Sequence, residues 1–557
     1  MTSSILDHLI FLYGDAAGQQ TYEKVQQLLA AYQPRLPEPD TAVFSERDTV
    51  LITYGDQVQS PGEAPLQTLA KFCDEWVNGR IQTIHLLPFY PYSSDDGFSV
   101  IDYKAVDPAL GSWDDVAAVG KNFQLMFDAV INHISAESKW FQGYLAGDPA
   151  YEDFFVAVDP SVDLSAVFRP RALPLLTSFE TKIGTRHLWT TFSADQIDLN
   201  YANPAVLLAV LDTLLFYVAK GATYIRLDAI GFMWKEPGTR CLNLPQTHRI
   251  IQLMRAVLDK VAPQVALITE TNIPHQENIA YFGNGRNEAQ MVYNFSLPPL
   301  ILHTFHTGNA RQLSRWAASL ELPSDRVTFF NFCASHDGIG LTPARGILSD
   351  AEIEAMAERV QALGGFVSYK ANGDGSQSAY ELNISYLNAL AVPAADESDD
   401  LIARRFLAAQ AIMLALRGVP GIYFHSLFGS QNWREGVQQT GRNRSINRQK
   451  LQREQLEQEL KSGLRQKVFS GYCELLKLRT AEKAFHPIGD QTILKLHPAV
   501  FAILRGHQRE QLLCLHNVSA DTVSVKLPLA GVELLTDTAV AHHITLAPYQ
   551  IAWIKPS

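Results

Sequence analysis

The feature that most constrains the fold is a regular alternation of short apolar runs with longer helical patterns, between about residues 50 and 430. Strands that are buried on both faces are apolar throughout, and parallel strands need helical crossovers between them. Eight such runs are the number that a closed barrel requires. The sequence therefore predicts an α/β fold, a (β/α)8 TIM barrel. The runs are Val50–Tyr54, Thr83–Phe89, Leu125–Ile131, Ala222–Leu227, Val265–Thr269, Met291–Phe295, Val327–Phe332 and Gly421–Leu427.

One helix between these runs has a clear beginning in the sequence. Ser112 is followed three residues later by Asp115. A serine at this position caps free backbone N–H groups, and an acid in the first turn suits the positive end of the helix. We therefore expect a helix to begin directly after Ser112.

Two connections are too long for simple crossovers, and the chain ends are different again. Long connections in a compact domain are usually functional insertions. Near the C-terminus the pattern changes to short alternating runs, which are typical of antiparallel strands. We predict an N-terminal helical segment (1–47), a catalytic barrel (48–136 and 200–484), an insertion domain B after strand 3 (137–199), a second insertion after strand 7 (about 338–400) and a small C-terminal antiparallel β-domain (485–557).

Composition and charge exclude several classes of function. Hydrophobic residues make up 47% and charged residues 19% of the chain, as in ordinary globular proteins. The formal net charge is −12 without a long basic cluster, which argues against nucleic-acid binding. No segment approaches the roughly 18 to 20 apolar residues that a membrane span needs. A protein that acts on small molecules is expected.

The cysteines and the N-terminus indicate a cytoplasmic enzyme. Five cysteines are widely spaced and odd in number, which fits neither a disulfide framework nor a zinc site. The first residues lack a basic start, and Asp7 and His8 interrupt the apolar stretch, so a cleavable signal is not expected.

Polar residues close four of the predicted strands, where the functional residues of a βα-barrel lie. They are Asp128, Asn132 and His133 after the third strand, Arg226 and Asp228 at the fourth, Glu270 after the fifth, and His336 and Asp337 after the seventh. A retaining glycoside enzyme needs a carboxylate nucleophile and a second carboxylic acid about 5 to 5.5 Å away. The four strand ends together predict such a site.

Asp228 and Glu270 fit this pair by their positions on adjacent strands. Arg226, two residues before Asp228, points to the same side of the barrel and would keep the nucleophile ionised. Glu270 suits proton transfer if burial raises its pKa. Taken singly, each acid has the alternative of capping a helix or binding a loop, and His133 and His336 have the alternative of supporting the scaffold.

Four stretches resemble the signature regions of the α-amylase family: DAVINH (128–133), RLDAIG (226–231), LITETN (267–272) and ASHDGIG (334–340). The resemblance implies that Asp228 is the nucleophile, Glu270 the acid/base, and Asp337 the carboxylate that stabilises an oxocarbenium-like transition state. It also implies that His133, Arg226 and His336 complete a subsite for glucose.

Further stretches, including 87–103, FRPR (168–171) and INR (446–448), resemble the sucrose phosphorylase group of that family over about residues 50–450. The resemblance implies a phosphate-binding arginine at Arg171, and Tyr380 in a loop that shifts between acceptor and phosphate. In the glucose subsite, it implies hydroxyl contacts from Asp95 and Arg444, a ring platform at Phe98, and rim residues Phe192 and Gln196.

The acceptor site departs from sucrose phosphorylase, with Phe232 for tyrosine, Asn272 for histidine, Glu381 for glutamine and Arg240 for serine. The N-terminal segment and residues 418–432 resemble the glucosylglycerate phosphorylases. That resemblance implies a double displacement that transfers α-glucose from 2-O-α-glucosylglycerate to phosphate, giving α-glucose 1-phosphate and glycerate. Glycerate is an anion, so Arg240, and secondly Lys235, are candidates for its carboxylate. Pairing with a surface acid is the alternative for Arg240.

Several alternatives stay open at this point. The donor could instead be glucosylglycerol, sucrose or sucrose 6'-phosphate, and an α-glucoside hydrolase would use the same carboxylates with water. Asn132 stands where calcium-dependent amylases place a ligand, but calcium needs six to eight oxygen ligands. We expect no metal and no cofactor, only a small glucoside and inorganic phosphate as partners, in a monomer or a homodimer.

Overall fold

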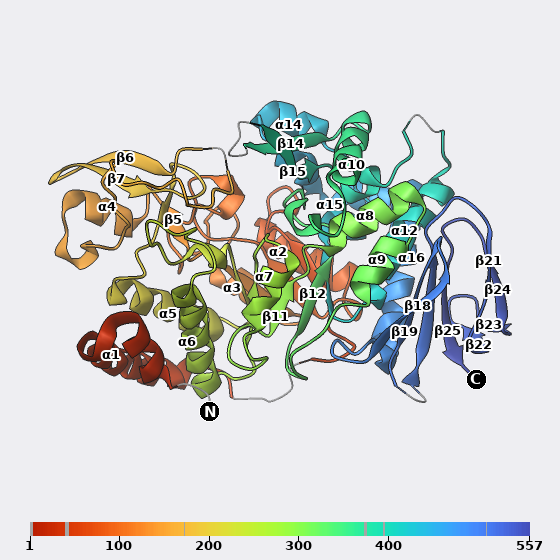
Figure 1. Cartoon of the computed structure of the whole chain (residues 1–557), viewed down its shortest axis with the longest axis horizontal. Helices are drawn as coiled ribbons and strands as arrows, with labels where there is room; N and C mark the ends of the chain where they lie inside the picture. Colours follow the sequence, from red (N-terminus) through yellow and green to blue (C-terminus); the bar gives the residue numbers. More distant parts are fainter. Residues whose placement is uncertain (1–3, 39–43, 172, 372–375, 394–395, 508–509) are drawn as a thin grey trace.

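The computed structural model describes residues 4–38, 44–171, 173–371, 376–393, 396–507 and 510–557 (Figure 1). Its centre is a closed parallel barrel in which the first strand pairs with both the second and the last. Most barrel residues are buried, as expected when helices cover the outer face. The predicted (β/α)8 fold is confirmed. In chain order the strands are β1 (Val50–Thr53), β3 (Thr83–Leu86), β4 (Gln124–Ala129), β9 (Ala222–Leu227), β10 (Ala266–Thr269), β11 (Met291–Tyr293), β12 (Thr328–Phe332) and β16 (Val419–Tyr423).

The eighth strand begins two residues earlier than the sequence predicts. It spans Val419–Tyr423, and the residues that follow form the short helix α13 (Phe424–Leu427). Proline has no N–H for a strand ladder, so Pro420 is an unexpected member of a central strand. It nevertheless lies in register with Asn331 of β12. The apolar run beyond Tyr423 misled the prediction because an apolar run alone does not separate helix from strand.

Helices cover the barrel and follow its strands. The helix predicted after Ser112 is confirmed, with a capping box between Ser112 and Asp115. The longer helices carry buried apolar residues on the sides that face the strands. The helices are α2 (Pro65–Trp76), α3 (Trp113–Val119), α5 (Pro204–Ala219), α6 (Pro245–Val261), α7 (His275–Ile279), α8 (Leu297–Thr307), α9 (Arg311–Ala317), α12 (Asp399–Ala415), α15 (Arg453–Glu459) and α16 (Gly463–Ala481).

Two long connections rise on the same side of the barrel (Figure 1). Both follow the C-terminal ends of their strands, where they form walls around the barrel mouth. The connection after β4 contains β5 (His133–Ser135), α4 (Lys139–Ala146), β6 (Leu176–Thr181), β7 (Gly184–Trp189) and β8 (Gln196–Asp198). The connection after β12 contains β13 (Ile339–Gly340), α10 (Asp350–Ala362), β14 (Phe366–Ala371), β15 (Gln377–Asn383) and α11 (Tyr386–Ala389).

The chain ends lie on opposite flanks of the barrel (Figure 1). Helix α1 (Ile5–Tyr32) packs against α5 and α6 and bends at Gly14, whose φ of 77° favours glycine. Residues 1–3 and 39–43 of the predicted segment 1–47 lie outside the described part. At the other end, β18 (Gln491–His497), β19 (Val500–Arg505), β20 (Leu512–Asn517), β25 (Ile551–Pro556), β22 (Gly531–Glu533) and β23 (Thr538–Val540) form an antiparallel sheet, beside the pair β21 (Val523–Lys526) and β24 (His543–Leu546). Among the described residues, no helix has the length and apolar character to cross a membrane.

Candidate active site

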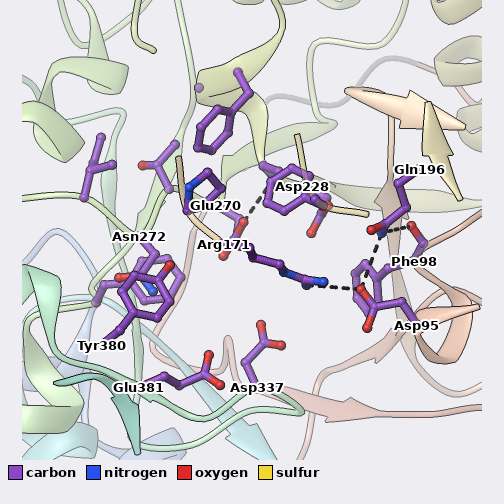
Figure 2. Close-up of a pocket in the computed structure, with 18 of the residues that line it drawn as sticks. Asp95, Phe98, Arg171, Gln196, Asp228, Glu270, Asn272, Asp337, Tyr380 and Glu381 are labelled. Atoms are coloured by element: carbon purple, nitrogen blue, oxygen red, sulfur yellow. Dashed lines mark hydrogen bonds and ion pairs between the residues drawn. The ribbon is translucent and has the colours of Figure 1, made fainter. Parts of the chain in front are cut away.

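A cavity opens at the C-terminal ends of the barrel strands, between the two long connections (Figure 2). Barrel residues form its floor, and residues from both connections form its walls. It brings together every site residue predicted from the sequence except Arg226, Lys235 and Arg240. Those that line it are Asp95, Phe98, His133, Arg171, Phe192, Gln196, Asp228, Glu270, His336, Asp337, Tyr380, Glu381 and Arg444.

Arg226, on β9, is the centre of a buried charge network below this cavity. Its Nη1 donates to Asp228 Oδ1 at 2.9 Å and also to Asp128. Its Nη2 lies 3.9 Å from Glu270 Oε1. Asp128 is fixed in turn by His85, whose Nε2 lies 2.7 Å from Asp128 Oδ2. Burial alone would raise the pKa of Asp128. Arg226 and His85 nevertheless lower this pKa to about 2. A permanently charged Asp128 therefore holds Arg226 within reach of both predicted catalytic acids.

The backbone after β9 helps to orient Glu270. Ala229, directly after Asp228, adopts a left-handed conformation with φ of 49°, which is uncommon for a residue other than glycine. Its N–H donates to Glu270 Oε2 at 3.1 Å. Strained backbone of this kind is concentrated at functional sites. Glu270 is thus held from two sides, by Arg226 and by the turn that follows the predicted nucleophile.

Asp228 and Glu270 both lie beside Arg226, but at different distances. Burial raises the pKa of Glu270, and Arg226 opposes this from 3.9 Å. Burial also raises the pKa of Asp228, but here Arg226 donates a hydrogen bond of 2.9 Å. When two buried carboxyls share one proton, the carboxyl with the closer cation keeps the negative charge. The arrangement therefore favours a charged Asp228 beside a protonated Glu270.

Asp337, after β12, is held as an anion. Arg444 Nη1 lies 2.5 Å from its Oδ1, and Arg448 Nη2 lies 3.5 Å from the same oxygen. Burial alone would raise the pKa of Asp337. Arg444 and the neighbouring His336 nevertheless keep this pKa well below its ordinary value. A fixed negative charge at this place can stabilise positive charge that develops on a sugar ring.

Aromatic and polar groups from separate elements surround the sugar-sized end of the cavity. The rings of Phe98 and His336 stack at 4.8 Å with an interplanar angle of 4°. Gln196, at the start of β8, donates from Nε2 to the Phe98 carbonyl at 2.9 Å, and its Nε2 lies 3.2 Å from His133 Nε2. The ring of Phe192 lies 5.3 Å from that of His133. The barrel and the first connection are therefore tied together around one subsite.

Arg171 is the cation that projects into the open part of the cavity (Figure 2). Its Nη2 lies 3.3 Å from Asp95 Oδ2, and its guanidinium lies 5.5 Å from the centre of the Phe192 ring. Burial alone would raise the pKa of Asp95, but Arg171 and Arg444 lower this pKa below its ordinary value. One third of the Arg171 side chain is exposed, so most of its donors are free to bind an incoming anion.

Tyr380 and Glu381, both on β15, form the wall opposite Asp228. Glu381 accepts two hydrogen bonds from Arg444, from Nε at 3.1 Å and from Nη2 at 2.6 Å. Glu381 therefore supports Arg444, and its role at the phosphate or acceptor position stays a prediction. Asn272, after β10, lines the same wall, and its buried Oδ1 has no hydrogen-bond partner in the described part of the chain.

The two predicted acceptor cations, Arg240 and Lys235, lie outside the cavity. Arg240 is a half-exposed surface arginine that pairs with Glu277 at 3.5 Å. Lys235 is buried, with its Nζ 2.6 Å from Asp198 Oδ2 and 2.9 Å from Asn132 Oδ1. Each cation has a carboxylate partner and neither lines the cavity, so their contact with the acceptor stays a prediction. Lys235 instead links β8 to the end of β4, and its ammonium contacts the oxygen of Asn132 that the resemblance associates with calcium.

We expect Lys235→Met to destabilise the fold strongly. The variant leaves the fully buried Asp198 carboxylate without its cation, which costs about 3 to 5 kcal/mol when one partner of a buried pair is removed. The measurement is urea unfolding followed by tryptophan fluorescence. Lys555→Met is the matched control, because its partner Glu482 forms an exposed pair worth less than about 1 kcal/mol. Equal midpoints for the two variants would contradict the assignment.

Some cavity residues were not among the predicted site residues. Thr271, Asn272 and Ile273 directly follow Glu270, so they could have been found by continuing the fifth strand beyond its acid. Phe168 begins the FRPR stretch and could have been found there, whereas Phe295 carries no polar group and no sequence signal separates it from core residues. In the described part of the chain, no cluster of three or more His, Cys, Asp or Glu side chains could hold a metal ion.

Comparisons with known proteins agree with this geometry. The model of the α-amylase catalytic domain matches residues 79–332. Glucosylglycerate phosphorylases of Spirochaeta thermophila and Allomeiothermus silvanus are 49% and 50% identical to this chain, over 98% and 100% of it and over 97% and 98% of their own lengths. The crystal structure of sucrose 6F-phosphate phosphorylase from Thermoanaerobacter thermosaccharolyticum has a TM-score of 0.76 and covers 90% of this chain and 99% of its own, which at 22% identity shows the fold alone. The chain therefore belongs to the glucosylglycerate phosphorylase family, within the α-amylase group of βα-barrel enzymes.

Proposed function

We propose that the protein is a retaining glycoside phosphorylase that transfers α-glucose from 2-O-α-glucosylglycerate to inorganic phosphate. The observation that carries this proposal is that Asp228, Glu270 and Asp337 line one cavity with Arg171. A hydrolase needs only the acids, whereas a phosphorylase also needs a cation where phosphate enters. The two relatives at about 50% identity, both glucosylglycerate phosphorylases, support the same substrate.

In the first half-reaction, Asp228 attacks the anomeric carbon and the bond to the glycerate oxygen breaks. That oxygen takes the proton of Glu270, so glycerate leaves as an alcohol with its carboxylate unchanged. Asp337 stabilises the positive charge that develops on the glucose ring. The product is a covalent glucosyl ester of Asp228.

In the second half-reaction, a phosphate oxygen attacks the same carbon and the ester to Asp228 breaks. The proton of the attacking phosphate oxygen returns to Glu270, which restores both acids. Two inversions give α-glucose 1-phosphate with net retention. Phosphate competes with water because Arg171 holds the anion beside the ester in a narrow cavity.

The acceptor side of the cavity suits a small anion. With Arg240 and Lys235 engaged elsewhere, Arg171 and Arg444 are the cations that line the cavity in the described part of the chain. Arg444 is already held by Asp337 and Glu381. Glycerate and phosphate occupy the acceptor side in alternate half-reactions, so Arg171 can serve both. Asn272 lines this side of the cavity as well.

A substrate panel tests the proposal. The protein is incubated with glucosylglycerate, glucosylglycerol, sucrose or sucrose 6'-phosphate, with and without phosphate, and glucose 1-phosphate is measured. We expect its formation from glucosylglycerate only when phosphate is present. Faster turnover of another donor would change the substrate but keep the reaction. Release of free glucose at the same rate without phosphate would reject the phosphorylase assignment in favour of a hydrolase.

We expect Arg171→Gln to weaken the use of phosphate. A hydrogen bond to a charged group is worth about 1.5 to 3 kcal/mol, so kcat/KM for phosphate should fall about 10- to 100-fold. The measurement is the ratio of glucose 1-phosphate to free glucose formed at a fixed phosphate concentration. Arg169→Gln is the matched control, since Arg169 is exposed on the same loop and does not line the cavity. An unchanged ratio for Arg171→Gln would contradict the role.

A further inference from the structure

A second, wider cavity lies outside the catalytic one. Its volume is about 660 Å³, and six residues line both cavities: Asp95, Pro170, Arg171, Tyr380, Glu381 and Arg444. The two spaces are therefore separated by side chains that the catalytic cavity also uses. We call the second space the outer cavity.

The carboxylates that line the outer cavity are already engaged. Asp95 lies 3.3 Å from Arg171, and Glu381 accepts two hydrogen bonds from Arg444. Asp195 accepts hydrogen bonds from the hydroxyls of Ser93, at 2.6 Å, and Ser94. Asp95 and Glu381 each have an arginine partner, whereas the charge of Asp195 is hydrogen-bonded by hydroxyls and has no cation beside it among the described residues.

Arg442 is different from the other arginines that line the outer cavity. Arg444 is bound by Asp337 and Glu381, and Arg448 by Asp96 and the His336 carbonyl. Arg442 is exposed and forms no ion pair with any described residue. Of the four arginines that line the outer cavity, Arg442 is the one that has no carboxylate partner among the described residues.

Hydrogen bonds of the backbone fix the position of Arg442. It lies between α14 (Arg434–Thr440) and the short 3-10 helix η7 (Asn443–Asn447), which carries Arg444. The Arg442 N–H donates to Thr440 Oγ1 at 3.2 Å, and the Arg442 carbonyl accepts from the Ser445 N–H at 3.1 Å. Both ends of this residue are thus tied down, and its side chain is the part that is free to contact a ligand.

We propose that the outer cavity is a second binding site for small anions, in which Arg442 captures phosphate or a carboxylate-bearing substrate before Arg171 receives it. The inference rests on the proposed function, because every reactant and product of that reaction is an anion: glucosylglycerate, phosphate, glucose 1-phosphate and glycerate. A net charge of −12 repels all four at long range. An unpaired guanidinium at the entrance reverses the local field and raises the anion concentration beside Arg171.

The test compares Arg442→Gln with the unmodified enzyme, using α-glucosyl fluoride as a neutral donor. At low ionic strength we expect kcat/KM for inorganic phosphate to fall about 3- to 10-fold, while hydrolysis of the fluoride without phosphate is unchanged. The difference should vanish near 1 M salt, where the Debye length is about 3 Å. Arg442→Lys keeps the charge and should behave as the unmodified enzyme does. Arg311→Gln, on α9 and away from both cavities, is the matched control for the loss of one exposed positive charge.

The outcomes separate the two proposals. If the unmodified enzyme makes no glucose 1-phosphate from glucosylglycerate and phosphate, the proposed function fails. If it does, and Arg442→Gln uses phosphate as well as Arg311→Gln does, the outer site is rejected. An equal fall for phosphate and for fluoride hydrolysis would also reject it, because Arg442 would then support the fold of the cavity and not the capture of anions.

Discussion

Asp228→Asn is expected to lower kcat for phosphorolysis of glucosylglycerate by about 10⁴- to 10⁶-fold, the scale of removing a covalent nucleophile. The amide cannot form the glucosyl ester, and no other acid takes its place. Asp128 is occupied by Arg226 and His85, and Asp337 by Arg444. The measurement is glucose 1-phosphate formation under saturating donor and phosphate, with mass spectrometry of the trapped intermediate.

This loss must not come from unfolding. Asp259→Asn is the matched control, because Asp259 is half-exposed, pairs with the buried Arg255 outside the cavity, and should keep full activity when replaced. The intact mass of the unmodified enzyme should rise by one glucosyl group after rapid quenching with α-glucosyl fluoride, and that of Asp228→Asn should not. A labelled Asp228→Asn, or activity above about one hundredth of normal, would place the nucleophile elsewhere.

Glu270→Gln has the second-largest expected effect, and the effect depends on the leaving group. Proton transfer by a positioned acid contributes about 10²- to 10⁴-fold, so turnover of glucosylglycerate should fall by that factor. Fluoride leaves without a proton, so the first step with α-glucosyl fluoride should fall far less. The measurement is kcat/KM for both donors at the same phosphate concentration. Equal losses for the two donors would contradict the acid role.

The pH profile gives an independent check on Glu270. Burial raises the pKa of this carboxyl, so its protonated form persists to higher pH than in an exposed glutamate. Activity on glucosylglycerate is lost as the pH rises through that pKa, because Glu270 then has no proton to donate to the leaving oxygen. This alkaline limb should be absent when Glu270→Gln acts on α-glucosyl fluoride. Glu277→Gln, at the protein surface beside Arg240, should keep the limb.

Much of the site could be predicted because of how a parallel barrel is built. The carboxyl ends of all eight strands meet at one face, so acids that close separate strands converge without any knowledge of the loops. Asp228, Glu270 and Asp337 follow β9, β10 and β12 and line one cavity as expected. His133, on the short strand β5, lines the same cavity because β5 begins four residues after the end of β4.

The acceptor side could not be predicted in the same way. A charged residue near a motif says nothing about the partners that the fold brings to it. Lys235 follows the nucleophile by seven residues, yet its ammonium turns toward Asp198, which arrives from another connection. Arg240 is only five residues further and faces Glu277 at the surface. Likewise, the entrance position of Arg442 results from a segment after β16 that packs beside the connection after β12.

The sequence by itself determined the barrel and the identity of its acids, because hydrophobic period and strand order are local properties that leave few ways to bury eight apolar runs. Only the tertiary structure decided which charges are neutralised and which stay available. Ion pairs form between residues far apart in the chain, and their strength depends on burial and on distances of a few ångströms. For that physical reason Lys235 became part of the scaffold, while Arg171 and Arg442 stayed open to anions.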